Sequence, residues 1–231
     1  MTTRSNQALI AAVRRDLAAA GDPTRAPAMQ AYMKSDMPYR GVPLPLVRKL
    51  CAAAFAAHPL ATAMEFENTV EELFTEASFR EERYAALQLA EYRAYARYQT
   101  PERIPLYRRL VIVGAWWDTV DELAGNLIGP ILLRHPDDIR PVVRSWITDQ
   151  NLWLRRSAII CQLRHKAATD LELLTTAIDR NAADRDFFIR KAIGWALRQH
   201  ARTDPDWVRA FVDAREHSLS GLSKREARKH L

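Results

Sequence analysis

The chain has 231 residues and a formal net charge of +6, with 48% hydrophobic and 27% charged residues. This length can bury one large core or two small ones, and the composition excludes a disordered or membrane class of protein. Only 7 glycines are present, whereas all-β and dinucleotide-binding folds need glycine for turns and phosphate loops, so helices are favoured. The basic residues are 28 Arg and 6 Lys, and guanidinium-rich chains favour a polyanionic partner.

The two cysteines, Cys51 and Cys161, are too few and too far apart to form a disulfide framework or a metal-binding knuckle. We therefore expect buried thiols in a reducing compartment, with no metal and no cofactor. No basic leader followed by an apolar run opens the chain, and the charge-free stretch over 51–64 is too short to cross a bilayer. These features predict a cytoplasmic protein that makes no membrane contact.

Apolar residues recur at spacings of three and four along the chain, the period of amphipathic helices. The pattern predicts thirteen helices, over residues 5–20, 25–37, 43–57, 63–76, 79–96, 101–113, 117–133, 136–148, 152–167, 170–180, 185–201, 205–215 and 223–230. A hydroxyl residue that precedes a glutamate by three positions can start a helix as a capping box. Five such residues lie near the expected helix starts, namely Thr62, Ser78, Thr119, Thr169 and Ser223.

The links between these helices are too short to hold strands. They predict antiparallel helix pairs stacked on one another, which is an all-α, α-solenoid architecture with a concave basic groove, built as a single domain over 1–231. Self-similarity between the pairs is weak in the sequence, so a compact irregular helical bundle stays the alternative.

Two helices carry charges inside an apolar stripe. On the helix expected over 117–133, spacing by four places Trp117 and Asp121 on one line. Asp121 is either a carboxylate favoured by the helix dipole or a catalytic group. On the helix expected over 152–167, Arg156 falls on the apolar side, where its charge must be paired or point into a cleft. An ion pair with a carboxylate such as Asp121 would satisfy it, and so would contact with a phosphate.

The helix expected over 185–201 has a tryptophan inside a cationic stripe, because Trp195 shares a face with Lys191, Arg198 and Arg202. This composition is typical of a nucleic-acid interface, although a solvated basic face with one tucked tryptophan would look the same. Residues 134–231 hold 19 basic and 13 acidic side chains, so the excess charge lies in this part. The predicted concave basic surface comprises Arg155, Arg156, Arg164, Lys191, Arg198 and Arg202.

Several segments of the chain match a known family. These are the sequences WWDTVD over 116–121, NLWLRR over 151–156, FFIRKAIGWALR over 187–198 and LSKREA over 222–227. Together with Tyr32-Met33-Lys34 and Gly41-Val42-Pro43, they resemble the AlkD-type DNA alkylation repair family over essentially the whole chain. The resemblance implies HEAT-like helical repeats and a DNA glycosylase that releases purines alkylated at N3 or N7 from duplex DNA.

The resemblance also implies roles for individual residues. It places the catalytic acid at Asp121 and its two aromatic partners at Trp117 and Trp195. The arginines that contact the DNA backbone fall on Arg156 and Arg198. The acid would stabilise an oxocarbenium-like sugar and position the attacking water, without a cofactor. No general acid is needed, because a cationic purine leaves as a neutral base.

Two further residues match the family less directly. Tyr32 corresponds to a tyrosine over the same cleft, and Arg164 stands where the family often has lysine. A monomer that clasps one alkylated duplex, without full base flipping, is what the resemblance implies. Two alternatives stay open, namely a non-catalytic helical-repeat protein that binds DNA or an acidic protein, and a self-resistance glycosylase for a bulky natural-product adduct.

Overall fold

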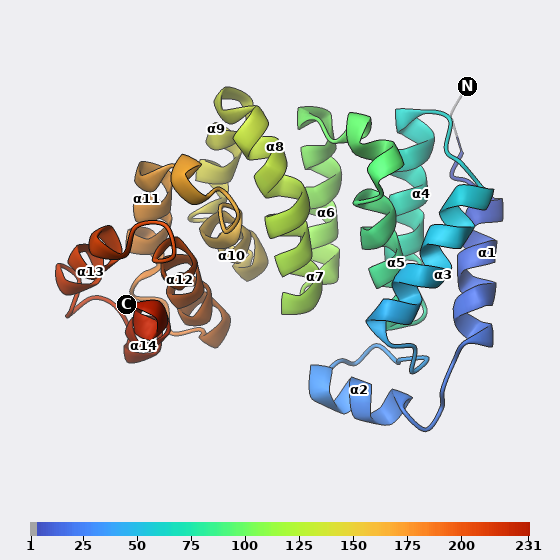
Figure 1. Cartoon of the computed structure of the whole chain (residues 1–231), viewed down its shortest axis with the longest axis horizontal. Helices are drawn as coiled ribbons and strands as arrows, with labels where there is room; N and C mark the ends of the chain where they lie inside the picture. The colour runs from blue at the N-terminus through green and yellow to red at the C-terminus, as the bar shows by residue number, and fades with distance from the viewer. Residues whose placement is uncertain (1–3) are drawn as a thin grey trace. The chain divides into compact units, whose positions relative to one another are not determined.

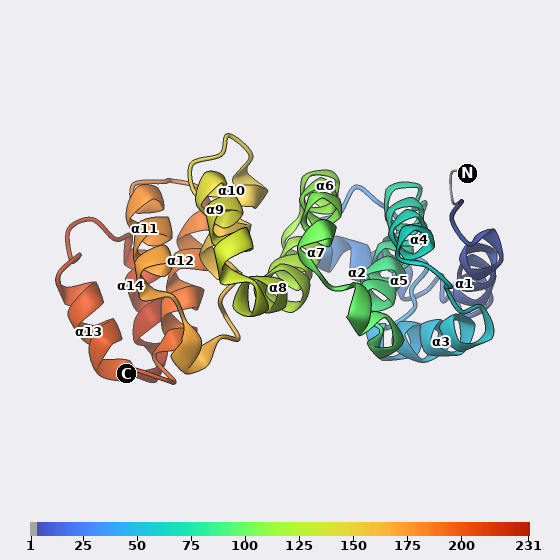
Figure 2. The ribbon, with the colours of Figure 1, turned by 90° about the horizontal axis from the view of Figure 1, so that it is seen from above.

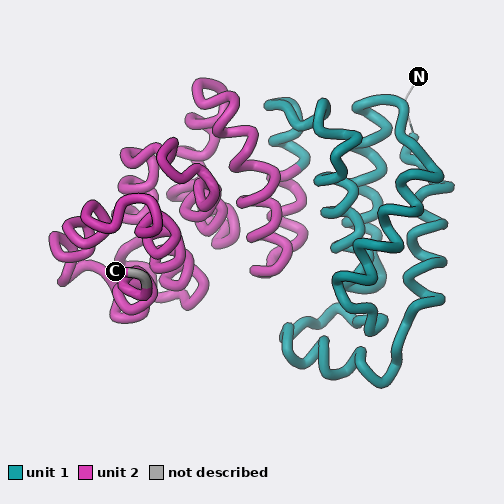
Figure 3. The backbone as a smooth tube through the Cα atoms, viewed as in Figure 1, with its two compact units in different colours: residues 1–106 teal, residues 107–231 magenta. Residues whose placement is uncertain are grey.

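A computed structural model describes residues 4–231, except for the side chain of His230. Fourteen α-helices and no strand occur within the described residues, so the predicted all-α class is confirmed. The chain divides into two compact units, residues up to 106 in unit 1 and residues 107–231 in unit 2 (Figure 3). None of the described helices is both long enough and apolar enough to span a membrane.

Unit 1 is built around a core of packed helices. In this unit α3 packs on α1 and α5, and α4 packs on α5 (Figure 1). The helices are α1 (Gln7–Ala19), α2 (Ala26–Met33), α3 (Leu44–Ala57), α4 (Ala63–Thr75) and α5 (Arg80–Ala90), followed by 3-10 turns over Arg93–Tyr98 and Pro101–Arg103. Its fully buried side chains include Leu9, Leu17, Phe55, Phe66 and Phe74.

A buried carboxylate at the start of α5 fixes the loop that follows α2. Glu81 accepts hydrogen bonds from the backbone amides of Arg40, Gly41 and Val42, at 2.9 to 3.1 Å. The loop needs glycine at 41, where φ is +85° and a Cβ atom would collide with the carbonyl oxygen of Asp22. Glu81 is therefore used by the loop, and the capping box predicted from it is wrong.

Unit 2 begins within α6 (Ile104–Gly114) and contains paired helices. In unit 2, α9, α11 and α13 follow one another along one side, and α10, α12 and α14 along the other (Figures 1 and 2). Contacts of α10 with α7 and α12, and of α12 with α14, join the second row. Their bounds are α9 Pro136–Trp146, α10 Leu152–Ile160, α11 Leu171–Asn181, α12 Phe187–His200, α13 Pro205–Asp213 and α14 Gly221–Ala227.

The helix predicted over 117–133 is present but changes its winding midway. It starts as α7 (Trp117–Glu122), continues as a π-helix over Leu123–Ile128, and ends as α8 (Gly129–Arg134). A π-helical segment adds a residue to the turn and shifts the angular position of everything after it. The face inferred for this helix from regular spacing is therefore correct only for its first turns, which contain Asp121.

Of the five predicted capping boxes, one is confirmed in its hydroxyl half, while its glutamate, Glu65, accepts from the amide of Ala61 rather than from that of Thr62. Thr62 caps α4 by accepting a hydrogen bond from the amide of Glu65 at 3.1 Å. At the other four starts the N-cap lies elsewhere, at Phe79, Trp116, Asp170 and Ser220. The predicted helices over 79–96 and 152–167 are also shorter than expected, because 3-10 segments replace their last turns.

Both cysteines are buried, unpaired thiols, as predicted from their number and spacing. Burial raises the pKa of the Cys51 thiol to about 12, and it does the same for Cys161. Both thiols therefore stay protonated and unreactive in neutral solution.

Candidate active site

Asp121 and Arg156 form a bidentate ion pair between α7 and α10. Arg156 donates from Nε to Oδ1 of Asp121 at 2.7 Å and from Nη2 to Oδ2 at 2.8 Å. The side chain of Arg156 is 4% exposed and that of Asp121 is 15% exposed. The ion-pair alternative for Arg156 thus describes this structure, in which both edges of the carboxylate are held by a buried guanidinium.

The same arginine reaches a third helix. Nη1 of Arg156 donates to the backbone carbonyl of Phe188, in the first turn of α12, at 2.6 Å. Three of its nitrogen atoms are therefore used on two partners, and the rotamer of the side chain is fixed from both sides. Because Asp121 is bonded to this fixed fork, the direction of its carboxylate is determined by α10 and α12 as well as by α7.

Two opposing effects act on the acid. Burial raises the pKa of Asp121 above its ordinary value, and the hydrogen bonds and charge of Arg156 act in the opposite direction. Nearby Asp118 and Glu122 add to the upward shift by charge repulsion. Arg156 is therefore the group that favours the ionised carboxylate at a site whose burial disfavours it.

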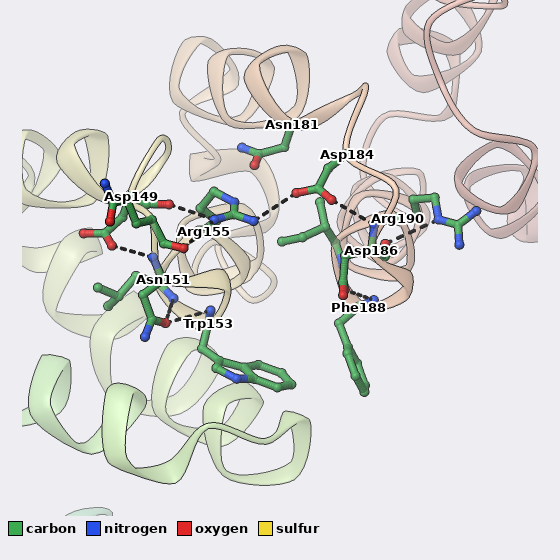
Figure 4. A network of polar contacts seen from close by, with 12 residues as sticks. Asp149, Asn151, Trp153, Arg155, Asn181, Asp184, Asp186, Phe188 and Arg190 are labelled. Atoms are coloured by element: carbon green, nitrogen blue, oxygen red, sulfur yellow. Dashed lines mark hydrogen bonds and ion pairs between the residues drawn. The ribbon is translucent and has the colours of Figure 1, made fainter.

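An aromatic cluster that the sequence reasoning missed adjoins the ion pair. The ring centroids of Trp116, Trp153 and Phe188 lie 5.0 to 6.0 Å apart, and Phe187 packs edge-on against Phe188 at 5.4 Å. These rings come from the N-terminal ends of α7, α10 and α12, so they pack the three helices together next to Asp121. Figure 4 shows Trp153 and Phe188 extending from neighbouring helix starts.

The two tryptophans predicted as aromatic partners flank this region along their helices. Trp117 is the first residue of α7, one turn before Asp121 and on the same face. Trp195 lies on α12, about two turns after Phe188. Both side chains are half-buried, so each keeps some surface that a ligand could contact.

Arg155, a predicted DNA contact, is tied into a polar network at the starts of α10 and α12 (Figure 4). It donates to Asp184 at 3.0 Å and to the carbonyl oxygens of Asp149 and Gln150. Asp184 in turn accepts from the amide of Asp186, the N-cap of α12. Arg155 therefore joins the two helix starts, and its side chain is one-fifth exposed.

The remaining predicted contacts lie in different surroundings. Arg164, just beyond α10, is exposed. Arg202 lines a cavity of about 350 Å³ near the C-terminal ends of α10 and α12, together with Lys166 and His200. Tyr32, near the end of α2 in unit 1, is exposed. Their roles in DNA binding stay predictions.

Lys191 and Arg198 converge on one acid that the sequence predicted only as the capping-box partner of Ser223. Glu226, on α14, bonds Lys191 at 2.8 Å and Arg198 at 2.6 Å. The signal was present in the sequence, since Glu226 lies within the LSKREA segment. Its partners could not be read from the sequence, because they depend on the packing of α14 on α12.

A constant spacing relates the site residues of neighbouring helices. The N-caps of α7, α10 and α12 are Trp116, Asn151 and Asp186, which are 35 residues apart. The charged positions that follow keep this spacing, at Asp121, Arg156, Lys191 and Glu226. Ion pairs join the first two of these positions and the last two. The four charged positions therefore share one spacing although their residue types differ.

Among the side chains that the structure describes, 4–229 and 231, no group of three or more His, Cys, Asp and Glu residues is arranged to hold a metal ion.

The fold is all-helical, and its candidate site combines a buried arginine–aspartate pair with clustered aromatic rings. Comparison with known protein families identifies the family to which such a chain belongs. The model of the family described as DNA alkylation repair enzyme matches residues 13–231, and the chain belongs to this family. A solved structure described as a predicted DNA alkylation repair enzyme from Enterococcus faecalis is 31% identical, with a TM-score of 0.82. The match covers 91% of this chain and 96% of that one. None of the curated proteins matches the chain.

Proposed function

We propose that the protein is a DNA glycosylase that hydrolyses the N-glycosidic bond of purines alkylated at N3 or N7 in duplex DNA. The observation that carries the proposal is the carboxylate of Asp121, held on both oxygens by the buried Arg156, in a member of the DNA alkylation repair enzyme family. Such an acid is fixed in direction before substrate arrives, which is the condition for electrostatic catalysis.

The enzyme need not protonate the leaving group in this reaction. A purine alkylated at a ring nitrogen is cationic, so cleavage of its glycosidic bond releases a neutral base without protonation. The sugar left behind develops positive charge at its anomeric carbon. A preorganised carboxylate such as Asp121 would stabilise that charge and orient the attacking water, with an effect increased by the low effective dielectric of a partly buried site.

The aromatic residues would act on the cation rather than on the bond. Trp117 and Trp195 are half-buried and could place their electron-rich faces beside the charged nucleotide. A cation–π contact of this kind is worth about 1 to 2 kcal/mol when desolvated. Selectivity would then come from the charge of the lesion, so the base need not be fully flipped.

The wider fold supports DNA as the substrate. We infer that the paired helices continue as HEAT-like repeats, forming an α-solenoid domain whose concave face carries the basic groove. The 19 basic and 13 acidic residues of 134–231 give this part its excess positive charge, which suits a duplex backbone. A monomer would suffice to bind one duplex.

Base release from alkylated duplex DNA tests the proposal. The wild type is expected to release N3-methyladenine or N7-methylguanine, detected directly as free base. Asp121→Asn is expected to lower the single-turnover rate by about 100-fold or more, the order found when one preorganised transition-state interaction is removed.

Glu122→Gln is the matched control, because Glu122 is the next residue on the same helix and removal of its charge should leave base release within about twofold. Absence of base release by the wild type, together with salt-sensitive duplex binding, would contradict the glycosylase proposal and favour a non-catalytic DNA-binding protein. Equal rates for wild type and Asp121→Asn would contradict the role of the acid.

A further inference from the structure

The ion-pair cluster around Glu226 has a buried acid and partly exposed cations. The side chain of Glu226 is 6% exposed, whereas those of Lys191 and Arg198 are 36% and 25% exposed. The acid thus lies underneath and the cations lie above it. A third cation, Lys229, bonds Oε1 of Glu226 at 2.6 Å.

The packing of α12 on α14 makes this arrangement possible. A Cβ atom at Gly194 would lie 2.5 Å from Cβ of Glu226 and 2.8 Å from the carbonyl oxygen of Ser223, so only glycine allows the two helices to approach this closely. The hydroxyl of Ser223 also donates to the carbonyl oxygen of Arg190 at 2.8 Å. Glu226 is therefore held against α12 by the backbone as well as by its ion pairs.

Both cations keep donors for a ligand. An ammonium group has three donors and a guanidinium group has five. Lys191 and Arg198 each place one nitrogen on Glu226, on Oε1 and Oε2 respectively. Because they bond to the two oxygens of one carboxylate, their head groups are held on either side of the same small group, where one phosphate could bridge them.

We propose that Glu226 is a positioning residue that holds Lys191 and Arg198 together as a clamp for one DNA phosphate. This inference rests on DNA as the partner named in the proposed function. Lys191 precedes Trp195 by four residues and Arg198 follows it by three, so all three lie on one face of α12. A phosphate in the clamp would place the backbone of the duplex beside Trp195.

Glu226 is ionised at neutral pH. Burial alone would raise the pKa of Glu226, but the bonds from Lys191 and Lys229 and the charge of Arg198 hold it at about 2. The cluster therefore contains three cations around one anion at neutral pH, which leaves positive charge for a phosphate while its geometry stays fixed.

Binding of an undamaged fluorescent duplex, followed by anisotropy at salt concentrations from about 50 to 200 mM, tests the clamp. Simple electrostatics predicts that Glu226→Gln binds more tightly, because a negative charge is removed. A positioning role predicts the opposite, a loss of roughly three- to tenfold in affinity, since the two cations are no longer held at one phosphate.

Asp179→Asn is the charge-matched control, because it also removes one ion-paired carboxylate, here bonded to Arg215. It is expected to leave affinity equal to or slightly above that of the wild type. Affinity of Glu226→Gln equal to or tighter than that of the control would overturn the proposal.

A second measurement applies if Glu226→Gln fails to fold. Each DNA phosphate that the protein no longer neutralises lowers the slope of the salt dependence of binding by about 0.9. Replacement of both Lys191 and Arg198 by Gln should therefore lower the slope by about 0.9, for one shared phosphate, and a drop of about 1.8 would overturn the clamp. Base release is not read in this assay, so failure of the clamp is distinct from failure of the glycosylase.

Discussion

The two carboxylate clusters of unit 2 use the same kind of ion pair in opposite arrangements. At Asp121 the cation is buried and the acid is the more exposed partner, with side-chain exposures of 4% and 15%. At Glu226 the acid is buried and the cations are the more exposed partners. The two acids lie at positions related by the 35-residue spacing, yet the first cluster exposes mainly its anion and the second mainly its cations.

The difference suggests what each cluster can bind. A buried arginine that presents a carboxylate offers negative charge to a cationic lesion, while a buried glutamate that presents a lysine and an arginine offers positive charge to a phosphate. The pKa values follow the same division. Burial raises the pKa of Asp121, whereas the surrounding cations hold the pKa of Glu226 at about 2.

After substitution of Asp121 itself, the largest effect in this comparison is expected when its buried cation is altered. Arg156→Lys keeps the charge but loses the planar fork that bonds Asp121 on two oxygens and Phe188 on its carbonyl. Base release is expected to fall by roughly 10- to 100-fold, because the carboxylate is no longer fixed in direction.

Affinity of Arg156→Gln for undamaged duplex DNA separates the two interpretations of Arg156, because this variant, unlike Arg156→Lys, removes the positive charge. If the residue acts through Asp121, affinity should change by less than about twofold, and the salt slope should stay constant. A salt-dependence slope lower by about 0.9 would instead mean that Arg156 contacts a phosphate. Its guanidinium, which is buried in the free protein, would then have to become accessible on binding.

A smaller effect, on stability, is expected at the α12–α14 contact. Gly194→Ala would force a methyl group against Glu226 and Ser223, and should lower the free energy of unfolding by about 1 to 3 kcal/mol. It should also weaken duplex binding, by moving Glu226 away from Lys191 and Arg198. Chemical denaturation and anisotropy measure the two effects.

Gly125→Ala is the matched control, since a Cβ atom at that position meets no atom within 4 Å. This variant should be as stable as the wild type or more stable by up to about 1 kcal/mol, the difference in helix propensity between the two residues. Equal stability of the two alanine variants would show that α14 is not closely packed at Gly194.

The smallest effects concern pH, and the two acids should differ in sign. The pKa of Glu226 is about 2 in the folded chain and about 4.3 when unfolded, so its contribution to stability is present above about pH 4.3 and is lost toward pH 2. The pKa of Asp121 is raised on folding, so its contribution falls as pH rises above its unfolded value near 3.9.

Denaturation of wild type, Glu226→Gln and Asp121→Asn between about pH 5 and pH 2.5 measures these contributions. The difference in the free energy of unfolding between wild type and Glu226→Gln should shrink as pH falls. A difference that stays constant with pH would contradict the depressed pKa of Glu226.

Helical periodicity predicted most of the fold, but it located the helix starts less well. Several capping residues often lie within two positions of one another, as at Thr169 and Asp170, and tertiary contacts decide which one is used. Glu81 illustrates the same limit, because a loop 40 residues earlier takes its carboxylate. The π-helix after Glu122 has no signal in the spacing of apolar residues.

The candidate site was predictable in part. The misplaced charge of Arg156 on an apolar face indicated a buried partner, and Asp121 was one of the alternatives that the structure now bears out as its partner. The aromatic cluster and the role of Glu226 depend on contacts between helices 28 or more residues apart, which periodicity cannot reveal. The 35-residue spacing would have linked them, but the residue types at its positions differ.

Single-turnover base release and undamaged-duplex affinity, measured on the same two variants, test the roles of the two acids most directly. The opposite arrangement of the clusters predicts that Asp121→Asn loses rate by about 100-fold or more while its affinity stays within a few-fold of wild type. It predicts that Glu226→Gln loses affinity, by roughly three- to tenfold. Loss of affinity in Asp121→Asn without loss of rate, or tighter binding by Glu226→Gln, would contradict the division of roles between the two acids.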